Sequence, residues 1–159
     1  MTTKNTSLVA NFVASPQVLN NPAELHGVLR TAHGTVELAA GDSGDDDIVM
    51  LAPIPSNAAV PSLLIGSDSL GGSCTFNVGI YTTAGVVKSE NVFASAVADA
   101  GAMTDVRFEA ANIDTNSKKM YELAGDATDP GGHYYIAATM AADGGTLGTM
   151  SWNISYVVN

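Results

Sequence analysis

Short runs of β-forming residues, separated by turn residues, dominate this sequence. Residues 47–81 hold three such runs, rich in Val, Ile, Leu and aromatic residues, with Pro-Ser-Asn and Gly-Gly-Ser between them. In the third run Phe76, Val78 and Ile80 alternate with Thr75, Asn77 and Gly79. A period of two places one set of side chains on one face of a strand. The pattern therefore predicts strands joined by turns, with Phe76, Val78 and Ile80 in a core.

The C-terminal stretch predicts a second clear core face. Over residues 146–159, Met150, Trp152, Ile154, Tyr156 and Val158 share one parity. We interpret the lone Trp152 as a core residue rather than as a platform for a sugar ring. Residues 134–141 predict another strand, and Asp143-Gly-Gly145 between the two predicts a hairpin-like turn.

The N-terminal third is less regular. The polar residues 1–7 precede a possible strand over 8–14, so we divide the chain into an N-terminal arm or first strand (1–15) and one domain (16–159). Residues 25–40 predict two short strands or one bent strand, because Gly27 and Gly34 would each cost a helix about 1 kcal/mol.

Two segments are predicted to be short helices. Residues 89–98 are Ala-rich, with Val92, Phe93, Ala96 and Val97 at helical spacing, and Ser117–Ala124 ends at Gly125. Residues 102–110 between them predict a returning strand. The expected fold is all-β: a jelly-roll-like β-sandwich of about eight to ten strands with one or two short helices.

Charge and hydropathy exclude several classes of function. The formal net charge is −10 and only six residues are Lys or Arg, which argues against nucleic-acid binding through phosphates. No apolar run approaches the roughly 20 residues of a membrane helix, so we expect no membrane partner. The polar first residues lack the apolar segment of a signal peptide, which predicts synthesis in a cytoplasm.

The sequence predicts no catalytic, cofactor-binding or metal-binding residues. It contains no Gly-x-Ser-x-Gly elbow, no Walker A motif and no dinucleotide loop, so we expect no enzyme and no cofactor. Cys74, the one cysteine, shares the parity of the core set and is interpreted as buried. His26 and His33 lack a third nearby zinc ligand. The acidic run Asp42–Asp47 does not fit an EF-hand, and the favoured interpretation is a solvated turn; a Ca²⁺ site there stays open.

The turn and strand signatures resemble those of a group of tailed-bacteriophage virion proteins. The resemblance is carried by Lys119-Met-Tyr-Glu-Leu-Ala-Gly125, Asp129-Pro-Gly-Gly-His-Tyr-Tyr-Ile136 and the closing Tyr156-Val-Val158. In the first half it is carried by Gly34-Thr-Val-Glu-Leu38, by Asp47-Ile-Val-Met-Leu51 and by the Pro53-Ile-Pro-Ser-Asn-Ala58 turn. It covers roughly residues 27–158. The group includes small head-associated structural proteins of the capsid cement, or decoration, type.

The resemblance implies a protein of the virion, on the outer surface of the capsid. Its implied partners are the major capsid protein and further copies of itself, as a homotrimer at local three-fold positions. A tail, neck or head-fibre component and a carbohydrate-binding β-sandwich are the alternatives. Because cement proteins gain reach from extended termini, we expect residues 1–15 to be mobile in the free subunit and to order on the capsid or on a sister subunit. The alternative is a tail that is mobile in both states.

Overall fold

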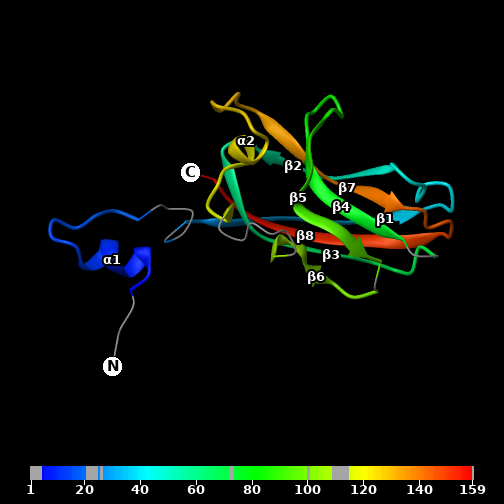
Figure 1. Ribbon diagram of the computed structural model, residues 1–159, viewed down its shortest axis with the longest axis horizontal. Helices are drawn as coiled ribbons and strands as arrows, with labels where there is room; N and C mark the ends of the chain where they lie inside the picture. The colour runs from blue at the N-terminus through cyan, green and yellow to red at the C-terminus, as the bar shows by residue number, and fades with distance from the viewer. Residues whose placement is uncertain are drawn as a thin grey trace.

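Two antiparallel four-stranded sheets pack face to face and form the body of the protein (Figure 1). The computed structural model describes residues 5–20, 25, 27–71, 74–99, 101–108 and 115–158. The first sheet has the strand order β1-β8-β3-β6 and the second has the order β2-β7-β4-β5. The predicted all-β sandwich is therefore confirmed, with eight strands among the described residues.

Each of the first four strands pairs with one of the last four. The first sheet contains β1 (Leu29–Leu38), β8 (Gly148–Val158), β3 (Ala58–Ser67) and β6 (Thr104–Asp105), and the second contains β2 (Ile48–Pro55), β7 (His133–Ala142), β4 (Thr75–Tyr81) and β5 (Val87–Ala98). Strands pair from the outside inward: β1 with β8, β2 with β7, β3 with β6 and β4 with β5. Two further pairs, β3 with β8 and β4 with β7, close the sheets. This is the strand order of a jelly roll.

The core lies between the inner faces of the two sheets. Phe76, Val78 and Ile80 of β4 are fully buried, as their alternation predicts. They lie among the inward residues Ile136 of β7 and Ile154 of β8 in one apolar cluster. Cys74, directly before β4, is also buried, and this burial raises the pKa of its thiol. The period of two thus identifies the core where a strand lies inside its sheet.

Trp152 faces the core but is only half-buried. Its register partners are Gly34 on β1 and the buried Ile65 on β3. A Cβ atom on Gly34 would lie 2.6 Å from Cζ2 of Trp152, so the indole occupies the space that a larger residue would take. The predicted orientation is right, but Trp152 lies beside the edge strand β1, and the rim of the core there is open to solvent.

The predicted strand over 8–14 is wrong, because Ser7–Val13 forms the helix α1. Leu8 with Phe12, and Val9 with Val13, are spaced four apart, so their side chains share one helix face. Figure 1 shows α1 lying apart from the sandwich, where no sheet edge offers it a partner. Residues 29–38 form one strand, which decides between the two forms predicted for residues 25–40.

The predicted helix over 89–98 is also wrong, because this segment belongs to the twelve-residue strand β5. The register with β4 shifts repeatedly: Val78 pairs with Ala94, but Ile80 pairs with Ser89. Ala96 has a φ of 53°, and its N–H donates to Oδ1 of Asn77 at 2.9 Å. Such bulges shift the alternation along a strand. Phe93 and Val97 are therefore both buried at a spacing of four, which imitates a helix in the sequence.

Two predictions for the connections are wrong and one is confirmed. Within residues 102–108, where a strand was expected, the structure has the two-residue β6 and the 3-10 turn η1 (Val106–Phe108). The helix predicted over 117–124 is confirmed as the single turn α2 (Met120–Leu123), which is followed by Gly125 at a φ of 82°. Asp143–Gly145 is no hairpin, because β7 and β8 lie in different sheets. His26 and the Gly72-Ser73 part of the predicted turn lie outside the described residues.

Gly79 of β4 leaves room for the backbone of the neighbouring strand β5 to approach closely. A Cβ atom at this position of β4 would overlap the backbone carbonyl oxygens of Ser89 and Glu90. We predict that Gly79→Ala lowers the free energy of unfolding by about 3 kcal/mol, since backbone rather than a side chain must move. Urea unfolding followed by fluorescence measures this. Gly41→Ala, where a Cβ meets nothing within 4 Å, is the control, and equal midpoints for both variants would contradict the close approach.

Candidate interaction surfaces

Each sheet has two edges, and three of the four edges carry features that block further pairing. β2 contains Pro53 and Pro55 and a register shift after Met50, β5 is bulged, and β6 has two residues. Such features are the usual protection of an edge against strand addition. β1 has none of them: its ten residues pair with β8 without a register shift and include no proline. β1 is therefore a long, regular edge suited to pairing with another strand.

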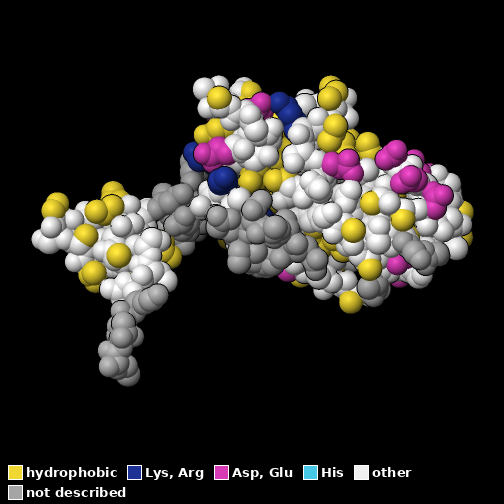
Figure 2. Space-filling model, viewed as in Figure 1, with side chains coloured by type: hydrophobic (Ala, Val, Ile, Leu, Met, Phe, Trp, Pro, Cys, Tyr) yellow, Lys and Arg dark blue, Asp and Glu magenta, His cyan; other side chains and the backbone are white. Residues whose placement is uncertain are grey.

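The N-terminal arm, defined here as residues 5–20, exposes apolar side chains. α1 contains no buried residue, and the exposed fractions are 65% for Phe12, 64% for Val13 and 91% for Leu19. Of the thirteen exposed large apolar side chains among the described residues, seven lie between Val9 and Leu29. The space-filling view shows yellow apolar atoms over this arm, away from the sandwich (Figure 2). An apolar face of this kind is typical of a contact with another molecule.

The arm is nevertheless ordered by its own hydrogen bonds. The side-chain amide of Asn11 donates to Oδ1 of Asn20 at 2.9 Å, and Nδ2 of Asn20 donates to the carbonyl oxygen of Leu8 at 3.1 Å. The N–H of Val18 donates to the carbonyl oxygen of Asn11 at 3.2 Å. These bonds fold the chain after α1 back against the helix. The arm is thus a small preformed unit.

A groove of about 360 Å³ lies between the edge strands β1 and β2, and we call it the β1–β2 groove. Val36 and Leu38 line it from β1, and Ile48 and Met50 line it from β2. Ile48 and Met50 are 44% and 39% exposed. Glu37, Asp42 and Asp47 line it as well. The groove is therefore lined by both apolar and acidic side chains.

Acidic side chains gather at the end of the sandwich that holds this groove. The loops β1–β2, β3–β4 and β7–β8 meet there, since the N–H of Asp45 donates to Oδ1 of Asp143 at 2.7 Å and the N–H of Thr146 donates to the carbonyl oxygen of Leu70 at 2.9 Å. Residues 39–47, 68–74 and 143–147 contain six Asp and neither Lys nor Arg. Figure 2 shows acidic atoms grouped at this end, opposite the arm. The field there favours a cationic or neutral partner over an acidic one.

Residues 42–47 form a turn, and two of its carboxylates have a local role. Asp42 accepts from the N–H of Ala39 at 3.0 Å, and Asp47 accepts from the N–H of Gly44 at 2.8 Å. Such bonds are those of Asp in ordinary turns. Within the described part of the chain, no group of three or more His, Cys, Asp or Glu is placed to hold a metal ion.

We predict that a chelator leaves the stability of the protein unchanged. The Asp side chains of this loop already bind backbone N–H groups, so EDTA should not shift the melting temperature measured by calorimetry. Asp143→Asn should lower that temperature equally with and without EDTA, because it weakens the bond to Asp45. A fall of more than about 10 °C on adding EDTA would instead require a structural ion.

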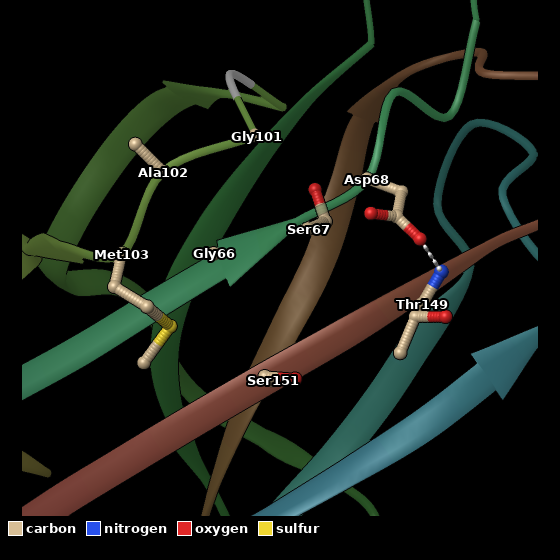
Figure 3. A pocket seen from close by; sticks show the side chains of 8 residues that line it. All are labelled: Gly66, Ser67, Asp68, Gly101, Ala102, Met103, Thr149 and Ser151. Carbon is tan, nitrogen blue, oxygen red and sulfur yellow. Dashed lines mark hydrogen bonds between the residues drawn. The ribbon is translucent and has the colours of Figure 1, made fainter.

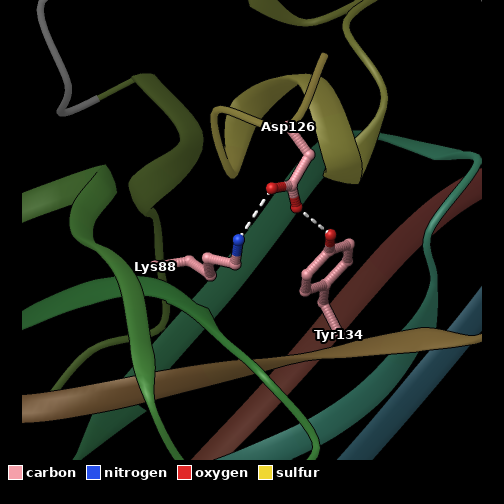
Figure 4. A network of polar contacts seen from close by, with 3 residues as sticks. All are labelled: Lys88, Asp126 and Tyr134. Atoms are coloured by element: carbon pink, nitrogen blue, oxygen red, sulfur yellow. Dashed lines mark hydrogen bonds and ion pairs between the residues drawn. The ribbon is translucent and has the colours of Figure 1, made fainter. Parts of the chain in front are cut away.

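A hollow of about 450 Å³ lies between the β4–β5 turn and the residues after α2. Nζ of Lys88 lies 2.7 Å from Oδ1 of Asp126, and the hydroxyl of Tyr134 donates to Oδ2 of the same carboxylate (Figure 4). The bond from Lys88 lowers the pKa of Asp126, with help from Tyr134. Burial, and next Asp126, raise the pKa of Tyr134 to about 12. The three groups satisfy one another and tie the end of α2 to β5 and β7.

This network predicts a pH dependence of stability at acid pH. Because the pKa of Asp126 is lowered in the folded state, its carboxylate stabilises the fold above the ordinary Asp pKa of about 4, and this contribution disappears as pH falls through the lowered value. Lys88→Met should therefore lower the melting temperature at pH 7, and this difference from the wild type should vanish at about pH 2. The exposed Lys118→Met is the control. A Lys88→Met deficit that is independent of pH would contradict the assignment.

A smaller hollow of about 160 Å³ lies on the outer face of the first sheet (Figure 3). Met103 borders it opposite Gly66 and Ser151, and a Cβ on Gly66 would lie 2.8 Å from the carbonyl oxygen of Ala102. Oδ2 of Asp68 accepts from the N–H of Thr149 at 3.3 Å. The residues that line it include Ser67, Asp68 and Ser151 but no His, Cys or Lys.

Two of the residues considered in the sequence analysis lie in different surroundings: His33 is exposed on β1, and Cys74 is buried directly before β4. Glu122 accepts from the N–H of Lys119 at the start of α2 at 2.7 Å. Sequence reasoning missed Arg107, which is fully buried. Its Nε donates to the carbonyl oxygen of Val60 at 2.9 Å and its Nη2 donates to Thr115 Oγ1 at 2.9 Å.

Arg107 has a structural role. Its guanidinium lies 5.4 Å from the centre of the Phe93 ring, a distance at which a cation is attracted to an aromatic face. Burial lowers the pKa of Arg107, against the opposite effect of Asp105. The side chain joins β3 to β5. No local pattern in the sequence marks an arginine for burial, so this role could not be predicted.

Two solved phage capsids contain chains with this fold. A chain of the cyanophage Pam1 capsid asymmetric unit matches with a TM-score of 0.51 and 15% identity, over 92% of this chain and 96% of that one. A chain of the capsid of Ralstonia phage GP4 matches with a TM-score of 0.53 and 18% identity, over 84% and 86%. At these identities the likeness shows a shared fold. No family model and no curated protein matches the sequence.

No helix among the described residues is long and apolar enough to cross a membrane.

Proposed function

We propose that this protein is a structural component of a tailed-phage head, and that it acts as a capsid cement protein. The observation that carries the proposal is the agreement of two independent likenesses. The turn and strand signatures resemble small head proteins, and the fold matches chains within two phage capsids. The matches extend over most of both chains, so the neighbours are proteins of similar size and not large proteins that merely contain such a domain.

The surface supports a role in binding rather than in catalysis. In the three hollows described above, the carboxylates accept hydrogen bonds from backbone N–H groups, a lysine, a tyrosine or the hydroxyl of Thr149. The regular β1 edge and the apolar arm are instead features of a protein that joins others.

The proposed partner is the major capsid protein on the outer surface of the head. A cement protein joins several capsid subunits, and its separate weak contacts add through effective concentration. The net charge of −10 favours a partner surface with basic residues. We propose a homotrimer at local three-fold positions, because one trimer then presents three equivalent contacts to the lattice.

Binding to undecorated heads tests this function. Purified protein added to phage heads that lack it should sediment with them at a fixed, high copy number and should raise the temperature at which they release DNA, because each bound copy holds neighbouring capsid subunits together. The same heads with an unrelated acidic protein are the control. Antibody labelling of complete virions locates the protein. Labelling of the tail, neck or fibres, or heads that neither bind the protein nor gain heat resistance, would refute the proposal.

A further inference from the structure

We propose that the protein attaches to the capsid through the outer face of its second sheet. The surface consists of six apolar residues of β2, β7, β5 and the β4–β5 turn, and we call it the second-sheet patch: Ile48, Met50, Pro53, Val86, Val87 and Tyr135. Its partner is an apolar surface bordered by Lys or Arg, which the proposed function assigns to the major capsid protein. The inference rests on that function, but its tests distinguish the two.

The strand register places these residues on one face. Pro53 of β2 is opposite Tyr135 of β7. Tyr135 is opposite Tyr81 of β4, and Tyr81 is opposite Val87 of β5. Residues that are opposite each other in an antiparallel sheet point to the same side. Because Ile136, the next residue of β7, belongs to the core, this row lies on the outer face.

The β4–β5 turn completes the patch by reaching back to β2, although β2 and β5 are opposite edges of the sheet. A Cβ atom on Gly85 would lie 3.9 Å from Cε of Met50, so the turn comes into contact with the side chain of that edge strand. Ile48 and Met50 share the outer face through their register with β7. Val86, directly after Gly85, thus joins them in one surface.

Exposed apolar side chains are concentrated in this patch. Among the described residues outside 9–29, six large apolar side chains are exposed, and four of them belong to the patch. Val86 is 60% exposed and Val87 is 50% exposed. The other two, Met103 and Leu147, lie on the outer face of the first sheet and in the β7–β8 loop. Grouped apolar exposure of this kind is typical of a contact with another protein.

The outer face of the first sheet differs, because it is polar. The hydroxyls of Thr35 and Ser151 share a hydrogen bond of 3.1 Å, and the hydroxyl of Thr149 donates to Oε1 of Glu37 at 2.9 Å. These side chains satisfy one another across β1 and β8, so they gain little from leaving water. Of the two outer faces, the second is therefore the one suited to an apolar contact.

The patch belongs to a rigid face. The side chain of Tyr81 is only 2% exposed, and its hydroxyl shares a hydrogen bond with Oγ1 of Thr139 on the same face. Ala137 and Thr139 are buried as well, although they have the outer parity of β7. Side chains that are already packed and bonded lose little further freedom on binding. The face is thus preorganised for a partner.

The charges around the patch select its partner. Asp45–Asp47 immediately precede Ile48, and Glu37 lines the groove beside it. Lys88, next to Val87, is neutralised by Asp126 at 2.7 Å. Figure 2 shows apolar atoms over the β4–β5 turn and acidic atoms toward the β1–β2 loop. An apolar contact with an acidic border is complementary to a partner with a basic border, and it disfavours the same face of a second copy, which would bring acid against acid.

Binding of variants to undecorated phage heads tests the assignment. Met50→Ser with Val86→Ser should weaken binding about tenfold or more, because two apolar side chains of the patch no longer leave water. Met103→Ser with Leu147→Ser removes two exposed apolar side chains outside the patch and is the matched control, which should bind like the wild type. Circular dichroism verifies that each variant is folded. A folded patch variant that binds as tightly as the wild type would overturn the inference and leave the proposed function standing.

Salt separates the apolar contact from its acidic border. Wild-type binding should weaken as NaCl is added, and Asp45→Asn with Asp46→Asn should flatten this dependence, since both carboxylates are exposed beside the patch. The Met50→Ser, Val86→Ser variant should keep the wild-type slope while it binds more weakly at every concentration. Equal slopes for the wild type and the Asn variant would reject a basic border on the partner.

Protection from a thiol reagent locates the contact directly. On heads, Val86→Cys should react with a maleimide about tenfold more slowly than in the free protein, because the partner covers it, whereas Met103→Cys should react equally in both states. The native Cys74 is buried and should add no labelling. Protection of Met103→Cys instead of Val86→Cys would assign the capsid contact to the first sheet and would overturn the inference.

Two remaining outcomes concern the proposed function and a second copy. Wild-type protein that does not bind heads would refute the proposed function, and this inference would fall with it. Light scattering of the purified variants gives the other outcome. If the patch variant alone changed the oligomeric state, and the Met103→Ser, Leu147→Ser control did not, a second copy would be the partner of the patch. In that case the proposed function stands and the assignment of this face to the capsid falls.

Discussion

The nested pairing of β1 with β8, β2 with β7, β3 with β6 and β4 with β5 is the constraint on which the rest of this structure depends. Buried backbone N–H and C=O groups must be paired, and this order pairs them while it brings two apolar faces together. The same order fixes which strands are left at the edges, namely β1, β6, β2 and β5. The core and the open edge β1 are therefore consequences of one topology.

The sequence predicts the interior of the sandwich well, because burial on one face of a strand leaves a period of two. Phe76, Val78 and Ile80 show this most clearly, and Ile154 follows the same rule in β8. The prediction fails where a strand is irregular. In β5, bulges opposite Gly79 shift the phase, so that Phe93 and Val97 fall at helical spacing although they lie in a sheet. Local periodicity carries no information about a partner strand that arrives from elsewhere in the chain.

The candidate surfaces could not be predicted in the same way. Ile48 and Met50 are apolar in the sequence like any core residue, yet both are exposed, whereas Leu51 and Ile54 of the same strand are buried. Arg107 is charged like any surface residue, yet in η1 its side chain is buried, where it contacts Val60 of β3 and Phe93 of β5. In the arm, the i, i+4 spacing of Leu8 and Phe12 is the one local signal for a helix.

The charge of this chain lies on the sandwich and not on the arm. Residues 5–20 contain no Asp, Glu, Lys or Arg, whereas the loops at the far end of the sandwich contain six Asp and neither Lys nor Arg. At physiological ionic strength the electrostatic field of such a surface is screened within about 8 Å, so this acidic end acts on a partner only at close range. The proposed attraction to a basic capsid surface therefore acts through the sandwich, and the arm can contribute only apolar and hydrogen-bonded contacts.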